Sequence, residues 1–143
     1  MGCSVADVEG DGDGDLFVTN FGPDVFLAND GDGHFSDVTA DLGLGDGRWS
    51  TGSGFLDYDN DGDLDLFVVH YVDFSLEENV PCRQGRIRSY CDPDSYDPVP
   101  DALYRNEGRR FRDVSREAGI SGLGRGLGLI LADLDWDGDT DVY

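Results

Sequence analysis

Short apolar runs recur along the chain and are separated by runs rich in Asp, Gly and Asn. Runs of this length that are rich in Val, Phe, Tyr and Leu and bounded by turn residues are typical of β-strands. The first four lie at residues 2–6, 16–20, 25–28 and 35–39, the next four at 52–56, 66–71, 102–105 and 111–114, and a last pair at 126–132 and 142–143. The pattern predicts two four-stranded antiparallel units and the start of a third.

The units repeat at two spacings. Asp7 and Asp57 occupy equivalent places 50 residues apart, whereas Asp57 and Asp133 are 76 residues apart. One unit is therefore about 50 residues long, and the second carries an insertion of about 26 residues. Four short strands in about 50 residues are typical of a propeller blade. A β-sandwich is the alternative, but it does not explain why each acidic loop falls at the same place in its unit.

We therefore predict an all-β fold, a partial β-propeller with two blades and the first hairpin of a third. The predicted units are blade 1 at residues 1–45, blade 2 at 46–122 with an insertion at 72–100, and the truncated start of blade 3 at 123–143. The chain is expected to begin inside a repeat and to need further blades of a longer parent chain as partners.

A nine-residue acidic pattern joins the first and second strands of each unit. It has a carboxylate at every odd place and Gly at the sixth; the copies at 7–15, 57–65 and 133–141 are called loops 1, 2 and 3. A tight turn of this composition points several oxygens at one place, which suits Ca²⁺, a cation that takes six to eight oxygens. We therefore expect up to three calcium ions.

The candidate metal ligands are all fifteen carboxylate residues of these loops. They are Asp7, Glu9, Asp11, Asp13 and Asp15 in loop 1, Asp57, Asp59, Asp61, Asp63 and Asp65 in loop 2, and Asp133, Asp135, Asp137, Asp139 and Asp141 in loop 3. In the seventh place, Asp13, Asp63 and Asp139 are expected to offer the backbone carbonyl, and the ninth residue is expected to close the coordination shell.

Other functions of the loops fit less well. An EF-hand needs Glu in the twelfth place, where Val18 and Val68 stand here, and helices on both sides. Paired carboxylates also occur in glycosidases, but bound metal would remove their proton chemistry.

The two histidines do not indicate catalysis either. His34 and His70 have no Ser or Cys nucleophile beside them, and both are expected to face solvent. We predict no enzyme, with no catalytic residues and no organic cofactor site.

The net charge of the chain excludes some classes of binding partner. The formal net charge is −21, from 31 acidic residues and 10 basic residues that are all Arg. Such a chain repels nucleic acids and anionic membranes and attracts cations.

No segment is apolar for long enough to span a membrane, and no signal sequence is present. A disulfide between Cys82 and Cys91 is favoured over free thiols, as in proteins outside the cytoplasm.

The insertion at residues 72–100 is the most individual part of the chain. It carries Arg83, Arg86 and Arg88 together with Tyr90 and Tyr96, so one interpretation is a site for an acidic glycan or a partner protein. The favoured interpretation is a disulfide-linked surface loop whose arginines pair with neighbouring aspartates.

Several motifs resemble a known repeat. Residues 55–68, 103–108, 111–115 and 118–120 resemble the FG-GAP or VCBS repeats of integrin-α-type propellers, and most closely the cartilage acidic protein family that bears an ASPIC/UnbV tail. The resemblance implies a seven-bladed propeller, extracellular placement and calcium in the first hairpin of each blade. Three departures are Glu9 in the third ligand place, the presence of only two blades and a fragment, and the lack of an ASPIC/UnbV tail.

The expected function is therefore that of a calcium-binding extracellular module with a structural or adhesive role and a protein or glycan ligand. An accessory region of a larger secreted hydrolase or lyase, or a carbohydrate-binding propeller, is the alternative.

Overall fold

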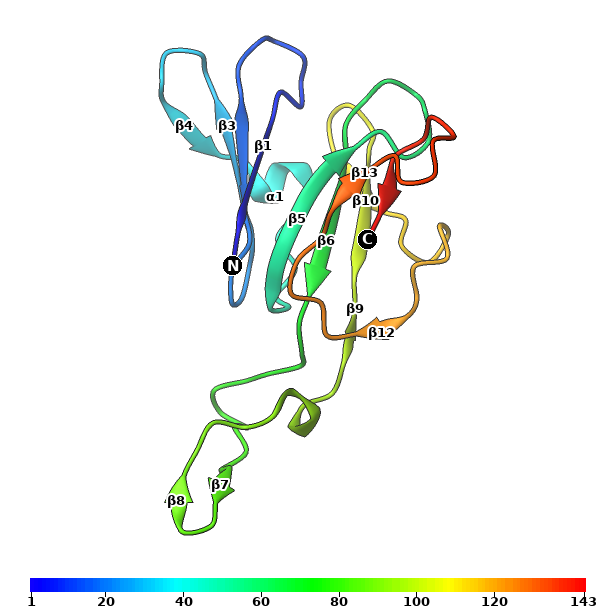
Figure 1. The fold of residues 1–143 in the computed structure, drawn as a ribbon. Helices are drawn as coiled ribbons and strands as arrows, with labels where there is room; N and C mark the ends of the chain where they lie inside the picture. The colour runs from blue at the N-terminus through cyan, green and yellow to red at the C-terminus, as the bar shows by residue number, and fades with distance from the viewer.

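Two four-stranded antiparallel sheets stand side by side in the computed structural model, which describes residues 1–143, and a hairpin begins a third (Figure 1). Blade 1 has the strand order β1 (Cys3–Ala6), β2 (Asp15–Val18), β3 (Val25–Asn29) and β4 (Phe35–Asp37). Blade 2 has the order β5 (Ser50–Leu56), β6 (Asp65–His70), β10 (Ala102–Asn106) and β11 (Phe111–Asp113). The last hairpin joins β13 (Leu131–Ala132) to β14 (Asp141–Val142). The predicted all-β fold, with two blades and the start of a third, is confirmed. The boundaries at residues 45 and 122 stay a prediction.

The outer strands end earlier than predicted because an aspartate turns the chain. In blade 1 the backbone N–H of Thr39 donates to the Asp37 carboxylate at 3.0 Å, and a short helix, α1 (Thr39–Leu42), follows. In blade 2 the N–H of Ser115 donates to Asp113 at 2.9 Å. Such local bonds compete with the strand ladder. In the third unit, residues 126–132 were predicted as strand, but only Leu131–Ala132 is one. Ile130 still exchanges two backbone hydrogen bonds with Tyr143, just beyond β14.

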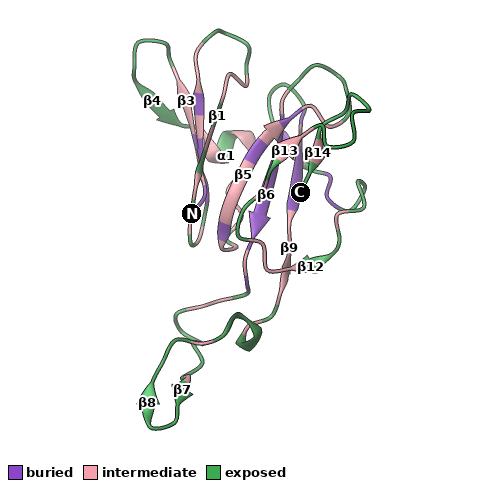
Figure 2. Cartoon of the chain, in the orientation of Figure 1, coloured by how far each residue is buried: buried purple, intermediate pink, exposed green.

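Blade 2 is covered on both faces. All six residues of β6 are buried, and Figure 2 shows buried residues concentrated in β5, β6 and β10. One hydrophobic cluster joins blade 2 to blade 1 and contains Phe17, Phe26, Leu66, Val68, Ala102, Tyr104 and Phe111. The other lies on the opposite face of blade 2, contains Leu56, Phe67, Val69, Leu103 and Val114, and packs against Leu129 and Leu131 of the third unit. This face-to-face stacking of successive sheets is the packing of propeller blades.

The inner strands of neighbouring units approach each other closely. Ser4 of β1 donates a hydrogen bond to the carbonyl of Ser53 in β5 at 2.8 Å. Farther along, Gly126 donates its N–H to the carbonyl of His70 at 2.9 Å, and a Cβ at this position would lie only 2.2 Å from a methyl carbon of Val69. Glycine is therefore required where the third unit meets blade 2.

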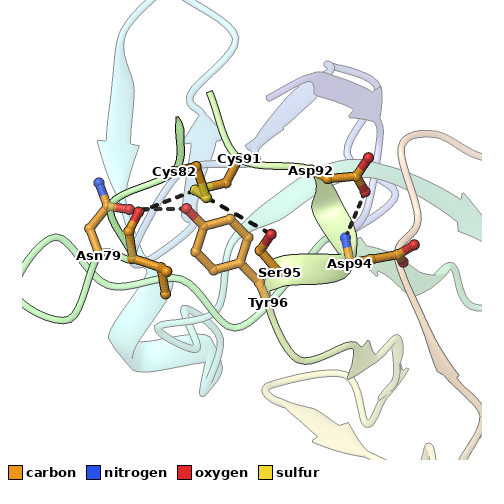
Figure 3. The surroundings of a disulfide bond; sticks show 8 residues. Asn79, Cys82, Cys91, Asp92, Asp94, Ser95 and Tyr96 are labelled. Carbon is orange, nitrogen blue, oxygen red and sulfur yellow. Dashed lines mark hydrogen bonds between the residues drawn. A yellow bond between two sulfur atoms is a disulfide. The ribbon is translucent and has the colours of Figure 1, made fainter. Parts of the chain in front are cut away.

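The insertion forms a separate lobe at the end of blade 2 that lies opposite the three acidic loops (Figure 1). It contains a hairpin of β7 (Arg83–Gln84) and β8 (Ile87–Arg88), a 3₁₀ turn η1 (Pro93–Ser95), and β9 (Val99–Pro100), which pairs with β12 (Leu123–Gly124). The predicted disulfide between Cys82 and Cys91 is present (Figure 3). None of the helices in the structure is long and apolar enough to span a membrane.

A polar network lies at the junction of the blades and the insertion. Asp46 Oδ2 accepts hydrogen bonds from Arg48 Nε at 3.0 Å and from the Tyr104 hydroxyl at 2.8 Å.

His70, beside this network, is fully buried because β6 is covered on both faces. The prediction that His70 faces solvent is therefore wrong. Its Nδ1 lies 3.0 Å from the carbonyl oxygen of Pro100, which can only accept, so Nδ1 carries a proton. Its Nε2 lies 3.4 Å from Asp46 Oδ2.

This network predicts a specific loss of stability in acid. Burial acts to raise the pKa of Asp46, but the neighbouring His70 and Arg48 outweigh it and hold the pKa well below its usual range. The ionised carboxylate is therefore favoured in the folded state, so its contribution is complete at neutral pH and is lost as the pH falls below about 4, the unfolded value. Asp46→Asn is expected to cost about 2 kcal/mol at pH 7 and much less at pH 3, as measured by urea denaturation.

The matched control for this experiment is Asp41→Asn, which changes an exposed carboxylate of α1. Its free energy of unfolding should follow that of the unchanged chain at both pH values. A difference between Asp46→Asn and the unchanged chain that is the same at pH 3 and pH 7 would contradict the ionic role of Asp46.

Candidate metal centre

Loops 1 and 2 fold in the same way around their first residue. In loop 2 the Asp57 carboxylate accepts the backbone N–H groups of Asp61 at 3.1 Å and Gly62 at 3.0 Å. The equivalent carboxylate of loop 1, Asp7, accepts the N–H groups of the fifth and sixth residues at 3.0 and 2.9 Å. The sixth residue has positive φ in each loop, 95° at Gly62, which explains the Gly there.

Loop 2 brings three carboxylates to one place. Oxygens of Asp57, Asp59 and Asp61 all lie within 4.8 Å of one another. Two oxygens that bind the same Ca²⁺ at 2.3–2.6 Å cannot be more than about 5 Å apart, so this spacing fits a shared ion. The Asp59 side chain is exposed and makes no hydrogen bond, whereas Asp61 also accepts the N–H of Asp63 at 3.0 Å. Asp59 is thus free to act as a ligand.

Loop 3 gathers a different trio. Oxygens of Asp133, Asp135 and Asp141 lie within 4.8 Å of one another. Here the first carboxylate accepts the N–H of Trp136, at 2.7 Å, in place of the N–H of the fifth residue. Trp136 has a φ of 67°, which is strained for a bulky residue. The first and third places therefore meet as they do in loop 2, while the ninth place replaces the fifth.

Loop 1 does not bring three of its carboxylates together within that distance. The Glu9 side chain reaches the Asp15 carboxyl, and burial, the hydrogen bond to Asp15 and the charge of Asp15 raise the pKa of Glu9 to about 7. The pKa of Asp13 is also raised, by desolvation and by the neighbouring carboxylates, and its Oδ1 is buried without a hydrogen-bond partner. The departure at Glu9 thus occurs in the one loop whose carboxylates do not form a trio.

The ninth-place aspartates of loops 1 and 2 have a structural role that the sequence did not reveal. Asp65 is fully buried and accepts the N–H groups of Tyr58 at 3.0 Å and Asn106 at 2.7 Å. Burial raises the pKa of Asp65, while these two hydrogen bonds oppose the rise. The carboxylate thereby ties the entry of the loop to the end of β10. Asp15 in blade 1 is fully buried too and accepts the N–H groups of Val8 and Asn29.

Two asparagines complete these arrangements. The amide nitrogen of Asn106 donates to the carbonyl of Leu64 at 3.2 Å, and that of Asn29 donates to the carbonyl of Gly14 at 3.2 Å. Each asparagine is the last residue of the third strand of its blade. Because the two asparagines occupy the same place in the repeat, the sequence alone could have indicated that they have the same role. The role of all fifteen carboxylate residues as metal ligands, including the carbonyls of Asp13, Asp63 and Asp139, stays a prediction.

Comparison with known proteins agrees with the repeat. No curated protein matches the chain. Residues 7–68 match the family described as FG-GAP-like repeat. The matched segment runs from the start of loop 1 through blade 1 and loop 2 into β6, so it covers one full period of the repeat and two acidic loops. This match supports an FG-GAP-like repeat, a β-propeller element, in the part of the chain that carries loops 1 and 2.

Proposed function

We propose that this chain is a calcium-binding propeller segment that acts as an interaction module outside the cytoplasm. The observation that carries the proposal is the trio Asp57, Asp59 and Asp61, whose oxygens lie within 4.8 Å of one another at the tip of the first hairpin of blade 2. A second trio at the same place in the third unit supports it. Carboxylate oxygens are the ligands that Ca²⁺ prefers.

The role of calcium would be structural. Without a cation, the clustered carboxylates of a loop repel one another. Desolvation, and after it the charge of neighbouring carboxylates, raises the pKa values of Glu9 and Asp13. A bound ion neutralises the cluster and fixes the hairpin that begins each blade. Because the ion binds the folded loop and not the unfolded chain, it stabilises the fold by mass action.

An extracellular location fits the type of site and the disulfide. Loops of this kind in extracellular modules bind calcium at about 10⁻⁴–10⁻³ M, far above the levels to which cytosolic sensors respond. The Cys82–Cys91 disulfide is of the kind that persists in oxidising compartments. FG-GAP-like repeats are generally modules for interaction, so we propose a binding role without catalysis, with a protein or a glycan as ligand and further blades as partners. Closeness to the cartilage acidic protein family is part of this proposal.

Calorimetric titration of the metal-free chain with Ca²⁺ tests the proposal. We expect binding with a stoichiometry of two to three, and the loss of one site in Asp59→Asn. This variant is suited to the test because the Asp59 side chain is exposed and makes no hydrogen bond, so the fold does not depend on it. Asp41→Asn serves as the control and should bind like the unchanged chain. The proposal fails if no heat of binding is observed, or if Asp59→Asn retains every site.

A further inference from the structure

A cleft with a cavity of about 820 Å³ lies between the end of blade 2 and the insertion. Trp49, Tyr71 and Phe74 line one part of it, and Tyr90 and Tyr96 line another. The ring centroids of Trp49 lie 5.3 Å from those of Tyr71 and 5.6 Å from those of Phe74, and Phe74 lies 5.3 Å from Tyr96. The volume is in the range of small-molecule sites, and the aromatic lining is typical of them.

The cleft is held in shape by several connections. Figure 3 shows the Cys82–Cys91 disulfide beside Tyr96, whose hydroxyl donates to the side-chain oxygen of Asn79 at 3.0 Å. Arg125 of the third unit donates to the carbonyl of Tyr96 at 2.9 Å and so fixes the other side of the insertion. The side of the cleft with Trp49 and Tyr96 is therefore formed before a ligand enters, which lowers the entropic cost of binding.

Cationic side chains are grouped in the segment beside this cleft. Residues 79–91 contain three arginines and no acidic residue, although the whole insertion at 72–100 carries six acidic residues. The favoured interpretation that Arg83, Arg86 and Arg88 pair with aspartates is wrong, because all the ion pairs of the structure involve other residues. The hairpin lies at the end of the molecule opposite the acidic loops. An anionic ligand would be attracted here and repelled there.

Several polar groups of the cleft have no hydrogen-bond partner in the chain. The hydroxyls of Tyr71, Ser89 and Tyr90 and the guanidinium of Arg88 make no hydrogen bond within the chain, although all four residues line the cleft. Several free hydroxyls set among aromatic faces match a ligand that has many hydroxyl groups and apolar ring faces. A guanidinium matches a carboxylate, which it binds through two parallel hydrogen bonds.

We propose that this cleft binds an oligosaccharide of uronic acids, with a carboxylate held by Arg88 and the apolar faces of the sugar rings against Tyr90 and the Trp49 cluster. An acidic peptide shares the charge but offers fewer hydroxyl partners. The inference names a ligand for the proposed interaction role and rests on that role, but it does not depend on the calcium loops, which lie at the other end of the molecule.

The test uses the 143-residue chain with calcium present and follows tryptophan fluorescence during titration, to which Trp49 at the cleft and Trp136 in loop 3 both contribute. The probe is a β-1,4-linked glucuronic acid tetramer, compared with cellotetraose, which has the same backbone without carboxylates. We expect the uronate to bind more tightly than cellotetraose. Arg88→Gln should weaken uronate binding about tenfold, as expected for loss of one charge-assisted pair, and Tyr90→Ala should weaken the binding of both sugars. Both side chains are exposed, so the fold should persist.

Arg86→Gln is the matched control, because Arg86 lies on the same hairpin but does not line the cleft. It should change uronate binding far less than Arg88→Gln. Three results would overturn the proposal: no binding of the uronate to the folded chain, equal losses in Arg86→Gln and Arg88→Gln, or binding of a tetraglutamate peptide at least as tight as that of the uronate. If the uronate does not bind but Ca²⁺ titrates as expected, the cleft proposal fails and the proposed calcium role stands. If the uronate binds but Ca²⁺ does not, the proposed calcium role fails and the cleft proposal stands.

Discussion

Replacing Asp65 with Ala is expected to destabilise the chain by about 3 kcal/mol even when no calcium is present. The Asp65 carboxylate is fully buried and accepts the N–H groups of Tyr58 and Asn106 at 3.0 and 2.7 Å. Its removal leaves two backbone donors in the interior without a partner, and each such donor costs about 1–3 kcal/mol. The free energy of unfolding should be measured by urea denaturation in EDTA, so that any contribution of bound metal is absent.

Asp59→Ala is the control from the same loop. Its carboxylate is exposed and makes no hydrogen bond, so the change in EDTA should stay within about 0.5 kcal/mol. Asp65→Asn should fall between the two, because the amide oxygen can still accept one of the two bonds. Equal stabilities of Asp59→Ala and Asp65→Ala would show that Asp65 is only a metal ligand and would contradict the structural role.

Features that repeat along the chain could be predicted from the sequence. The strands around loops 1 and 2 form as predicted, because alternating apolar runs and turn residues are local signals. The turn with Gly62 in the sixth place also led us to expect that Asp57, Asp59 and Asp61 meet, although loops 1 and 3, with Gly at the same place, do not gather the same three positions. The family match over residues 7–68 rests on the same repeated pattern.

Features that depend on contacts between distant segments could not be predicted. His70 is polar and ends a strand, yet it is buried because Asp46 and Pro100, from two other segments, cover it. The short sequence around Arg88 does not tell whether a carboxylate lies within ion-pair distance of it in space, and none does. The aromatic cleft likewise needs Trp49, from the start of blade 2, to meet Tyr96, from the insertion. Such placements are set by packing and not by local pattern.

Saturation with calcium is expected to give the largest change in stability. At a free Ca²⁺ concentration a hundredfold above its dissociation constant, each occupied site adds about 2.7 kcal/mol to the free energy of unfolding. Loops 2 and 3 each gather a trio of carboxylates, so two sites together should add about 5 kcal/mol. For a chain of this size, 1 kcal/mol raises the melting temperature by about 3 °C, so thermal denaturation in EDTA and in calcium should differ by about 15 °C.

Asp59→Asn separates the stabilisation that calcium gives through loop 2 from the stabilisation that it gives through the other loops. Since the Asp59 side chain makes no hydrogen bond, this variant should melt like the unchanged chain in EDTA but gain only about half as much from calcium. Mg²⁺ at the same concentration should stabilise far less, because it demands octahedral geometry at 2.0–2.1 Å and gives up its waters reluctantly. Identical melts in EDTA and in calcium would contradict the structural role of the ion, whereas an equal gain from Mg²⁺ would indicate general charge screening by divalent cations.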